Sequence, residues 1–299
     1  MTGQRPGQLK RWGRIVSLLS VLTLLAACST LRIGYSQADT LAYWWIDHYL
    51  DFSATQAPQV RQALAQWQTW HRTRQLPDDL ALLDQAAQEA AADATPAQAC
   101  RWWKTVQGRQ ETYLQALVEP LLETVGSLDE RQLRHLQTKL DASNREWRDT
   151  YLRGDNDQRH RASTDRIIDR ADTLYGRIDS AQRRFISERV RSSPWDPHRW
   201  LQERQRQQQE LVTTLRAIAL PGQDKSQRLG LLRTWVGYTV RPSDEAARQY
   251  REQLVRFQCE LAADLHNRTT PEQREHAVER LQGWARDLRN AAGSMAAAR

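Results

Sequence analysis

The chain has little of what interrupts helices or builds sheets. Its 299 residues include only 13 glycines and 10 prolines, and β-branched residues are scarce. Alanine, leucine, glutamine, arginine and glutamate dominate instead, and these residues lose little on entering a helix. The composition therefore excludes a β-rich fold and predicts an all-α multi-helix bundle of about eight to ten helices.

Long apolar runs are also missing after residue 28. The best candidate, Leu211–Leu220, is short and is interrupted by Arg216. We therefore expect no membrane-spanning helix in the body of the protein. Its length is enough for one large or two small hydrophobic cores.

The first residues resemble the signal peptide of a bacterial lipoprotein. Its positively charged start contains four basic residues, Arg5, Lys10, Arg11 and Arg14. The mostly apolar run Ile15–Leu25 follows, and it is too short and ends too abruptly for a spanning helix. The run closes with Leu25-Ala26-Ala27-Cys28, which is similar to the lipobox. This resemblance implies cleavage between Ala27 and Cys28 and attachment of diacylglycerol to the Cys28 thiol.

The implied lipid anchor predicts where the protein resides. Several acyl chains on Cys28 would make release negligible, at about 0.8 kcal/mol per buried methylene. In such lipoproteins an aspartate after the cysteine usually signals retention at the inner membrane, whereas here Ser29 follows. We therefore expect the outer membrane, on its periplasmic side. The covalent lipid is the only cofactor that we expect.

Strong charge of one sign is missing from the mature chain. The formal net charge is +7, but the leader supplies four of the 43 basic residues and none of the 36 acidic ones. Elsewhere arginines alternate with acids, as in 145–191, which is typical of solvated, ion-paired helix faces. No contiguous basic stripe remains, so we expect no nucleic-acid partner.

Cysteine is rare, with three residues in the whole chain. With Cys28 assigned to the lipid, Cys100 and Cys259 remain, and the oxidising periplasm permits a disulfide between them. Each also lies in an apolar helical pattern, where a buried free cysteine is an ordinary small hydrophobe. Both interpretations stay open.

Apolar periodicity predicts two helices clearly. Within Ser243–His266 one stripe faces a core, formed by Tyr250, Leu254, Phe257, Leu261 and Leu265. Thr95-Pro96 is typical of a helix start, and the long helix that follows contains Pro120. Its expected buried face carries Trp103, Val106, Tyr113, Leu117, Leu121 and Val125.

The segment Ser192–Pro197 is the strongest helix break after the leader, because it contains two prolines three residues apart. We place a subdomain boundary there. The expected organisation is a signal peptide at 1–27, a lipidated N-terminus and spacer at 28–36, and helical subdomains at 37–193 and 194–299.

A capping residue stands three positions before a glutamine at four expected helix starts. The pairs are Ser53 and Gln56, Asp129 and Gln132, Asp179 and Gln182, and Thr270 and Gln273. This is the spacing of a capping box, in which cap and glutamine satisfy each other's free backbone amides. The pattern is also similar to the Leu-Thr-x-x-Gln motif of periplasmic helical proteins of the Spy and CpxP type. That resemblance implies a chaperone or stress adaptor that binds unfolded envelope proteins.

Aromatic and acidic residues gather soon after the anchor. The candidate cluster comprises Tyr35, Asp39, Trp44, Trp45, Asp47, Tyr49, Asp51, Trp67, Trp70, His71 and Arg72. Together with the lipobox, its Tyr-Trp-Trp-x-Asp-x-Tyr-x-Asp and Trp-His-Arg elements resemble a family of uncharacterised bacterial lipoproteins, known only by a domain-of-unknown-function label. The resemblance implies a helical structure and an envelope location, and it brings no activity.

The cluster has a structural and two functional interpretations. In the structural one, Leu41, Trp44, Trp45 and Ile46 face a core, and His71 or Arg72 pairs with Asp47 or Asp51 to join two helices. In the second, aromatics and carboxylates line a groove for peptidoglycan sugars or a partner helix. In the third, paired carboxylates hydrolyse a glycoside, which needs them about 5–9 Å apart across a cleft.

Other catalytic and metal-binding motifs are missing. The seven histidines show no metal-ligand spacing, and the chain has no Cys-x-x-Cys, phosphate loop or nucleophile elbow. We expect no metal site. The sequence favours a non-enzymatic interaction protein that binds an envelope protein or peptidoglycan. A holdase-like chaperone and a cell-wall enzyme are the alternatives.

Overall fold

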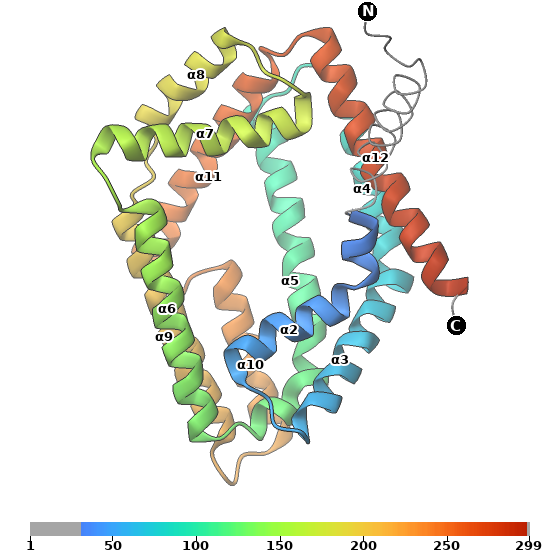
Figure 1. Cartoon of the computed structure of the whole chain (residues 1–299), viewed down its shortest axis with the longest axis vertical. Coiled ribbons are helices and arrows are strands. Elements are labelled where there is room, and N and C mark those ends of the chain that lie inside the picture. The colour runs from blue at the N-terminus through green and yellow to red at the C-terminus, as the bar shows by residue number, and fades with distance from the viewer. Residues whose placement is uncertain (1–30, 298–299) are drawn as a thin grey trace, which may run out of the picture.

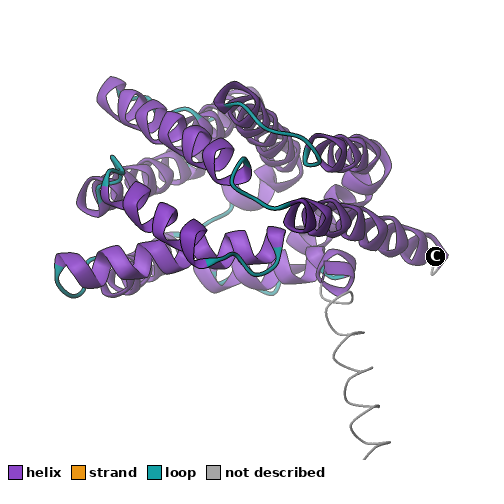
Figure 2. Ribbon diagram, turned by 90° about the horizontal axis from the view of Figure 1, so that it is seen from above, coloured by secondary structure: helices purple, strands orange, loops and turns teal. Residues whose placement is uncertain are grey.

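The computed structural model describes residues 31–297, and all regular structure in that range is helical (Figure 2). The all-α prediction is confirmed, with eleven α-helices in this range, just above the expected number. The leader, Ala27 and Cys28 lie outside the described residues. The α-helices are α2 (Ala38–Leu50), α3 (Gln56–Trp70), α4 (Leu76–Glu89), α5 (Pro96–Gly126), α6 (Glu130–Tyr151), α7 (Asn156–Tyr175), α8 (Ser180–Arg191), α9 (Pro197–Ala219), α10 (Lys225–Val240), α11 (Glu245–His266) and α12 (Pro271–Ala297).

Helix α5 is the central element of the bundle (Figure 1). It packs against α3, α9, α10 and α11. Around it, α6 packs against α9 and α2, and α12 packs against α4 and α7. Helices from both sides of the Ser192–Pro197 break are thus in contact, and the boundary at 193/194 stays a prediction. No helix within the described range is long and apolar enough to cross a membrane.

Many of the buried apolar side chains fall into four clusters, which are partly connected because Val125 packs against two of them and Phe52 against another two. The largest lies between α6 and α9 and includes Leu133, Leu136 and Leu215. The second cluster joins α5, α9 and α10, and the third joins α7, α8 and α11. The fourth lies between α2 and α3. Each helix buries only a narrow stripe because its other faces carry charged and amide side chains, so burial is shared among several contacts.

The sequence predicted the register of α11 correctly and that of α5 only in part. All five residues of the predicted α11 stripe are buried. In α5, Thr95 caps the start, as expected. Trp103 and Val106 are exposed, however, which corrects the predicted buried face. The neighbouring Trp102 donates its indole N–H to Glu89 Oε2 at 2.8 Å, and adjacent helical positions differ by about 100°, so Trp103 turns outward.

Cys100 of α5 and Cys259 of α11 are joined by a disulfide, with their Cα atoms 5.2 Å apart. The bond closes a sequence separation of 159 residues. In the chain-entropy account, closing so long a loop stabilises the folded state by roughly 5 kcal/mol. The disulfide therefore reinforces the packing of α5 on α11, in a bundle whose apolar clusters are small.

All four predicted capping boxes form. Asp129 with Gln132, and Asp179 with Gln182, show both reciprocal hydrogen bonds. Thr270 and Gln273 make the same two contacts, at 3.2 and 3.0 Å. At Ser53 the backbone amide donates to Gln56 Oε1 at 3.0 Å, one turn before α3 becomes regular.

The four capping glutamines also form two pairs, and each pair joins the starts of two different helices. Gln132 Nε2 donates to Gln56 Oε1 at 2.8 Å, and Gln56 Nε2 donates back to Gln132 Oε1 at 3.3 Å. Gln182 and Gln273 form the same reciprocal pair, at 2.7 and 3.0 Å. The first junction lies at the bottom of Figure 1 and the second at the top.

Each glutamine also binds the turn of its partner. Gln56 Nε2 donates to Ser127 O at 3.0 Å, and Gln132 Nε2 donates to Leu50 O and Asp51 O at 3.1 Å. At the second junction the acceptors are Arg268 O and Arg177 O. One side chain thus satisfies the start of its own helix and the end of another helix.

Three further capping boxes do not pair in this way. They are Thr95 with Gln98, Asp155 with Gln158, and Asp224 with Gln227. In the paired boxes the residue before the cap is half-buried at Phe52 and buried at Leu128, Ile178 and Thr269. In the unpaired boxes it is half-buried at Ala94 and Gln223 and exposed at Gly154, so burial of this residue is greater in three of the four paired boxes.

We predict that Gln132→Ala lowers the free energy of unfolding by about 2–3 kcal/mol, because it leaves buried carbonyl and amide groups of both turns without partners. Gln227→Ala, at an exposed box with the same local geometry, should cost under about 1 kcal/mol. Urea-induced unfolding of both variants checks this difference. Equal losses would show that pairing across the junction adds nothing to the cap.

Candidate functional site

The structure distributes the predicted aromatic and acidic cluster among three places. They are a half-buried network around His71, the exposed face of α2, and a groove along α3. The π-helical turn η1 (His71–Gln75) joins α3 to α4 and holds the centre of the network. Such turns are often found at functional sites.

His71 connects the segment that precedes α2 to α4. Its Nδ1 lies 3.1 Å from the hydroxyl of Tyr35, and its Nε2 lies 3.3 Å from Asp79 Oδ2. An imidazole with its proton on Nε2 donates to the carboxylate and accepts from the phenol. The His71 and Asp79 side chains are only 12% and 18% exposed. Gln68 Nε2 also donates to Tyr35 O at 2.7 Å, so two contacts hold this segment.

Asp79 extends the network to α5. Arg109 Nε donates to Asp79 Oδ1 at 2.8 Å, and the Tyr113 hydroxyl donates to the same oxygen. Arg109 Nη2 forms an ion pair with this oxygen at 2.7 Å and donates its hydrogen bond to Gln75 O. The indole of Trp67 donates to Tyr113 O at 2.9 Å. The rings of His71 and Tyr113 meet edge to face, with centroids 4.9 Å apart. Helices α3, α4 and α5 are thereby joined by one polar network.

The electrostatics of the network favour a fixed charge on Asp79. Burial alone would raise the pKa of Asp79, but hydrogen bonds from His71, Tyr113 and Arg109 together outweigh it and lower that pKa. Burial raises the pKa of Tyr35 and of Tyr113 to about 12. At neutral pH both phenols therefore keep their protons and serve as hydrogen-bond donors. This arrangement suits an internal brace between helices.

The predicted pairing of His71 or Arg72 with Asp47 or Asp51 is wrong. Asp47 Oδ1 accepts from Phe52 N at 3.0 Å, and Asp51 pairs with Arg131 of α6. Both carboxylates therefore hold the C-terminal end of α2. Asp51 has a φ of 48°, a left-handed conformation that ends the helix.

Two other residues of the predicted cluster have local roles. Asp39 lies in the first turn of α2, where its Oδ1 accepts from Thr40 N at 2.7 Å. Arg72 is half-buried, and its Nη1 has no hydrogen-bond partner in the described part of the chain. The same part of the chain contains no group of three or more His, Cys, Asp and Glu side chains suited to a metal ion.

The sequence did not identify Asp79, Arg109 and Tyr113 as members of the site. Tyr113 was expected only as a core residue, and Asp79 lies among ordinary acids of a helix start. Their contacts span 30 to 34 positions along the chain, across the α4–α5 turn, and no periodic pattern encodes such a distance.

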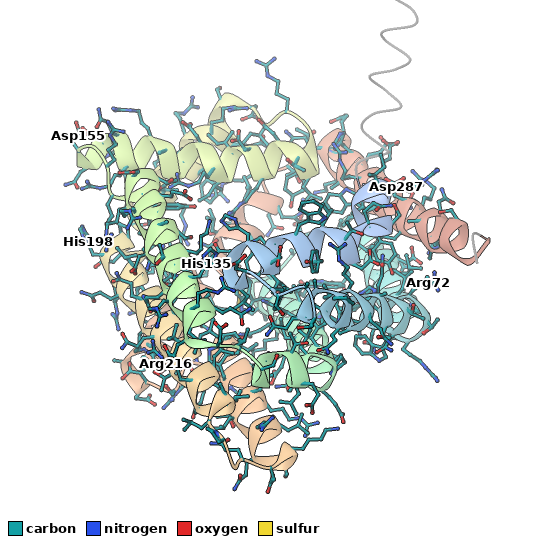
Figure 3. The ribbon with its side chains drawn as sticks, turned by 60° about the horizontal axis from the view of Figure 1, so that its bottom comes forward. Arg72, His135, Asp155, His198, Arg216 and Asp287 are labelled. Atoms are coloured by element: carbon teal, nitrogen blue, oxygen red, sulfur yellow. A yellow bond between two sulfur atoms is a disulfide. The ribbon has the colours of Figure 1, made fainter. Side chains whose placement is uncertain are left out.

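The face of α2 that was expected to point into a core is largely exposed. Leu41, Trp44 and Trp45 are 57%, 65% and 67% exposed. Tyr43 is buried instead, stacked on Phe52 with ring centroids 6.3 Å apart. The register of α2 is set at its C-terminal end, where His135 of α6 (Figure 3) contacts the carbonyl oxygen of His48. Tyr49 is half-buried in the cluster between α6 and α9, and its ring lies 5.1 Å from that of Trp45.

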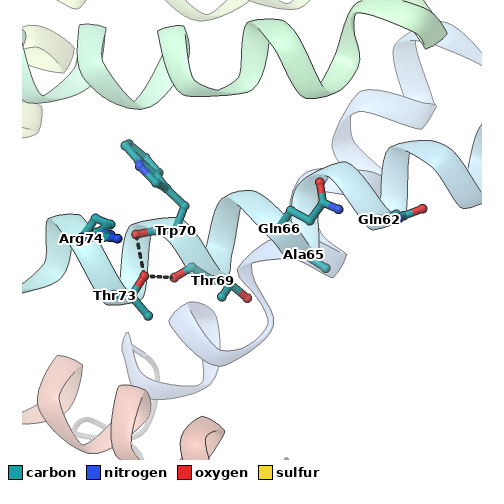
Figure 4. A pocket seen from close by; sticks show the side chains of 7 residues that line it. All are labelled: Gln62, Ala65, Gln66, Thr69, Trp70, Thr73 and Arg74. Carbon is teal, nitrogen blue, oxygen red and sulfur yellow. Dashed lines mark hydrogen bonds between the residues drawn. The ribbon is translucent and has the colours of Figure 1, made fainter.

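A shallow groove of about 550 Å³ follows the outer side of α3 and η1. It is lined by Gln62, Ala65, Gln66, Thr69, Trp70, Thr73 and Arg74. Figure 4 shows these side chains along one stretch of helix, with the Trp70 indole standing away from the helix axis. The lining combines amides, hydroxyls, one indole and one guanidinium group, and neither His71 nor Asp79 contributes to it.

We predict that Asp79→Asn lowers the free energy of unfolding at pH 7 by about 1–3 kcal/mol. Because the folded state lowers the pKa of Asp79, its stabilising contribution is present above the usual value of 3.8 and is lost as the pH falls through the lowered value. The difference from the unsubstituted protein should therefore shrink in urea titrations below about pH 4. Asp149→Asn on α6 is the control, since Asp149 is exposed and lies outside this network. A difference that persists unchanged at low pH would contradict the charged network.

Comparison with protein families places residues 48–232 in one model, described as "Family of unknown function (DUF6279)". The matched region begins after Trp44 and Trp45 and contains His71, Asp79 and the α3–η1 groove. Comparison with curated proteins and with solved structures found no match. The match covers more than half of the chain, so the protein belongs to the DUF6279 family.

Proposed function

We propose that this protein is a lipid-anchored interaction protein of the cell envelope. Cys28 holds it on the periplasmic side of the outer membrane, and its helical body binds another envelope component without catalysis. The anchoring is supported by the charged start, the apolar run and the lipobox-like residues Leu25–Cys28.

The observation that carries the binding role is the groove along α3 and η1. Its amide and hydroxyl groups can hydrogen-bond to sugars, and the Trp70 indole offers an apolar face beside them. Arg74 adds a cation suited to a carboxylate. This chemistry fits a peptidoglycan fragment, which carries sugar hydroxyls and peptide carboxylates. Among the described residues that line the groove, none is Asp or Glu.

A holdase-like chaperone is the second candidate. It is favoured by the four paired capping glutamines, whose spacing is similar to the Leu-Thr-x-x-Gln motif. Exposed Leu41, Val106 and Leu220 also supply apolar surface for an unfolded client.

We predict that Cys28→Ala moves the full-length protein from the membrane fraction to the soluble fraction of the periplasm, because the thiol that accepts the lipid is missing. Fractionation together with incorporation of labelled palmitate checks this. Cys100→Ser/Cys259→Ser is the matched control and should stay in the membrane fraction. Membrane association and labelling that survive in Cys28→Ala would overturn the anchor.

We predict a saturable change in tryptophan fluorescence when muropeptides are added to the mature domain, beginning at Ser29. Trp70→Ala should abolish the change because it removes the indole of the groove, whereas Trp200→Ala on α9 should preserve it. Gln66→Ala/Arg74→Ala is a second test, since both side chains are exposed and not part of the core.

The same titration separates the two candidates. A response to a denatured envelope protein but not to muropeptides, together with suppression of its aggregation, would favour the chaperone. No response to either ligand would overturn the groove as the binding site.

A further inference from the structure

We propose that the exposed face of α2 lies on the phospholipid surface next to the anchor and gives the protein a second membrane contact. This inference rests on the proposed anchoring at Cys28. It concerns a surface separate from the α3–η1 groove.

The proposed contact is a stripe of exposed residues without fixed charge on two helical segments that meet at Gln37, and the exposed Arg32 adjoins it at Ile33. Residues 31–36 are already helical, and α2 follows after a single turn residue. The exposed positions of the stripe recur at helical spacing, and they are Ile33, Gln37, Thr40, Leu41, Trp44, Trp45 and His48. None of them is Asp, Glu, Lys or Arg. Ile33 is 58% exposed, and the two indoles at the other end are exposed further still.

Tryptophan and leucine at such positions suit a bilayer interface. The indole has a broad apolar body and one N–H donor, so it is enriched where one side is apolar and the other is wet. An amphipathic helix with these residues on one face lies in the plane of the interface. In solution the same side chains would remain in water with no described element covering them, at a cost in free energy.

The position of the stripe relative to the anchor indicates which surface covers it. Leu31, the first described residue, is already helical and is only three residues after Cys28 in the sequence. Tyr35, which lies between the anchor and Trp44, is held by His71 and Gln68. A lipid on Cys28 therefore keeps the first turns of this helix close to the bilayer. Other exposed apolar residues, such as Val106 and Leu220, are remote in sequence from the anchor.

The test uses the full-length lipidated protein in vesicles of phosphatidylethanolamine and phosphatidylglycerol that carry brominated acyl chains. Bromine quenches indoles that reach the acyl boundary. We expect quenching in the unsubstituted protein and loss of most of it in Trp44→Phe/Trp45→Phe. The control Trp103→Phe/Trp200→Phe removes two indoles that are 46% and 39% exposed elsewhere, and its quenching should persist.

The outcomes separate this inference from the proposed anchoring. Flotation with the vesicles but without quenching would overturn the α2 contact alone. Quenching that is equal in both double variants would also overturn it, because other indoles would then carry the signal. Failure to float would overturn the anchoring and the inference with it. Circular dichroism of each variant confirms that exposed substitutions leave the helices intact.

Discussion

Two reciprocal pairs of glutamine amides, three of them buried and that of Gln273 half-buried, hold the turns of this bundle in place. Gln56 with Gln132, and Gln182 with Gln273, each close a helix start while donating to carbonyl oxygens at the end of another helix. The free donors and acceptors at helix ends are costly when buried without partners. The paired glutamine side chains give the backbone donors and acceptors of both turns partners within the protein. They also fix which helix ends lie together.

The apolar packing depends on these junctions because burial is divided among several contacts between pairs of helices. Four small clusters each join two or three helices, and the disulfide between Cys100 and Cys259 adds a covalent link between α5 and α11. Because burial is divided in this way, the direction in which each helix leaves its turn decides which apolar helix faces can pack against each other. The paired capping glutamines set that direction at four of the turns.

The His71 network also joins helices, but it does so through a charged carboxylate instead of through amides. A carboxylate that accepts from a histidine, a tyrosine and an arginine joins α3, α4 and α5 and holds Tyr35 against the body. Toward the C-terminal end of α2, the contact of His135 with His48 and the packing of Tyr43 on Phe52 set the rotation of this helix. This rotation leaves the indoles of Trp44 and Trp45 exposed, and they carry the proposed membrane contact.

The sequence by itself determined what depends on neighbours along the chain. Helical class, the four capping boxes, the start of α5 and the stripe of α11 all follow from spacings of three or four residues, which a helix translates directly into faces and ends. The lipobox is equally local, and it predicts the anchor. Only the tertiary structure decided that Asp79 is the partner of His71, that Asp47 and Asp51 end α2, and that Trp44 and Trp103 face outward. Each of these depends on the rotation of one helix against another, and that rotation is set by contacts between residues far apart in the sequence.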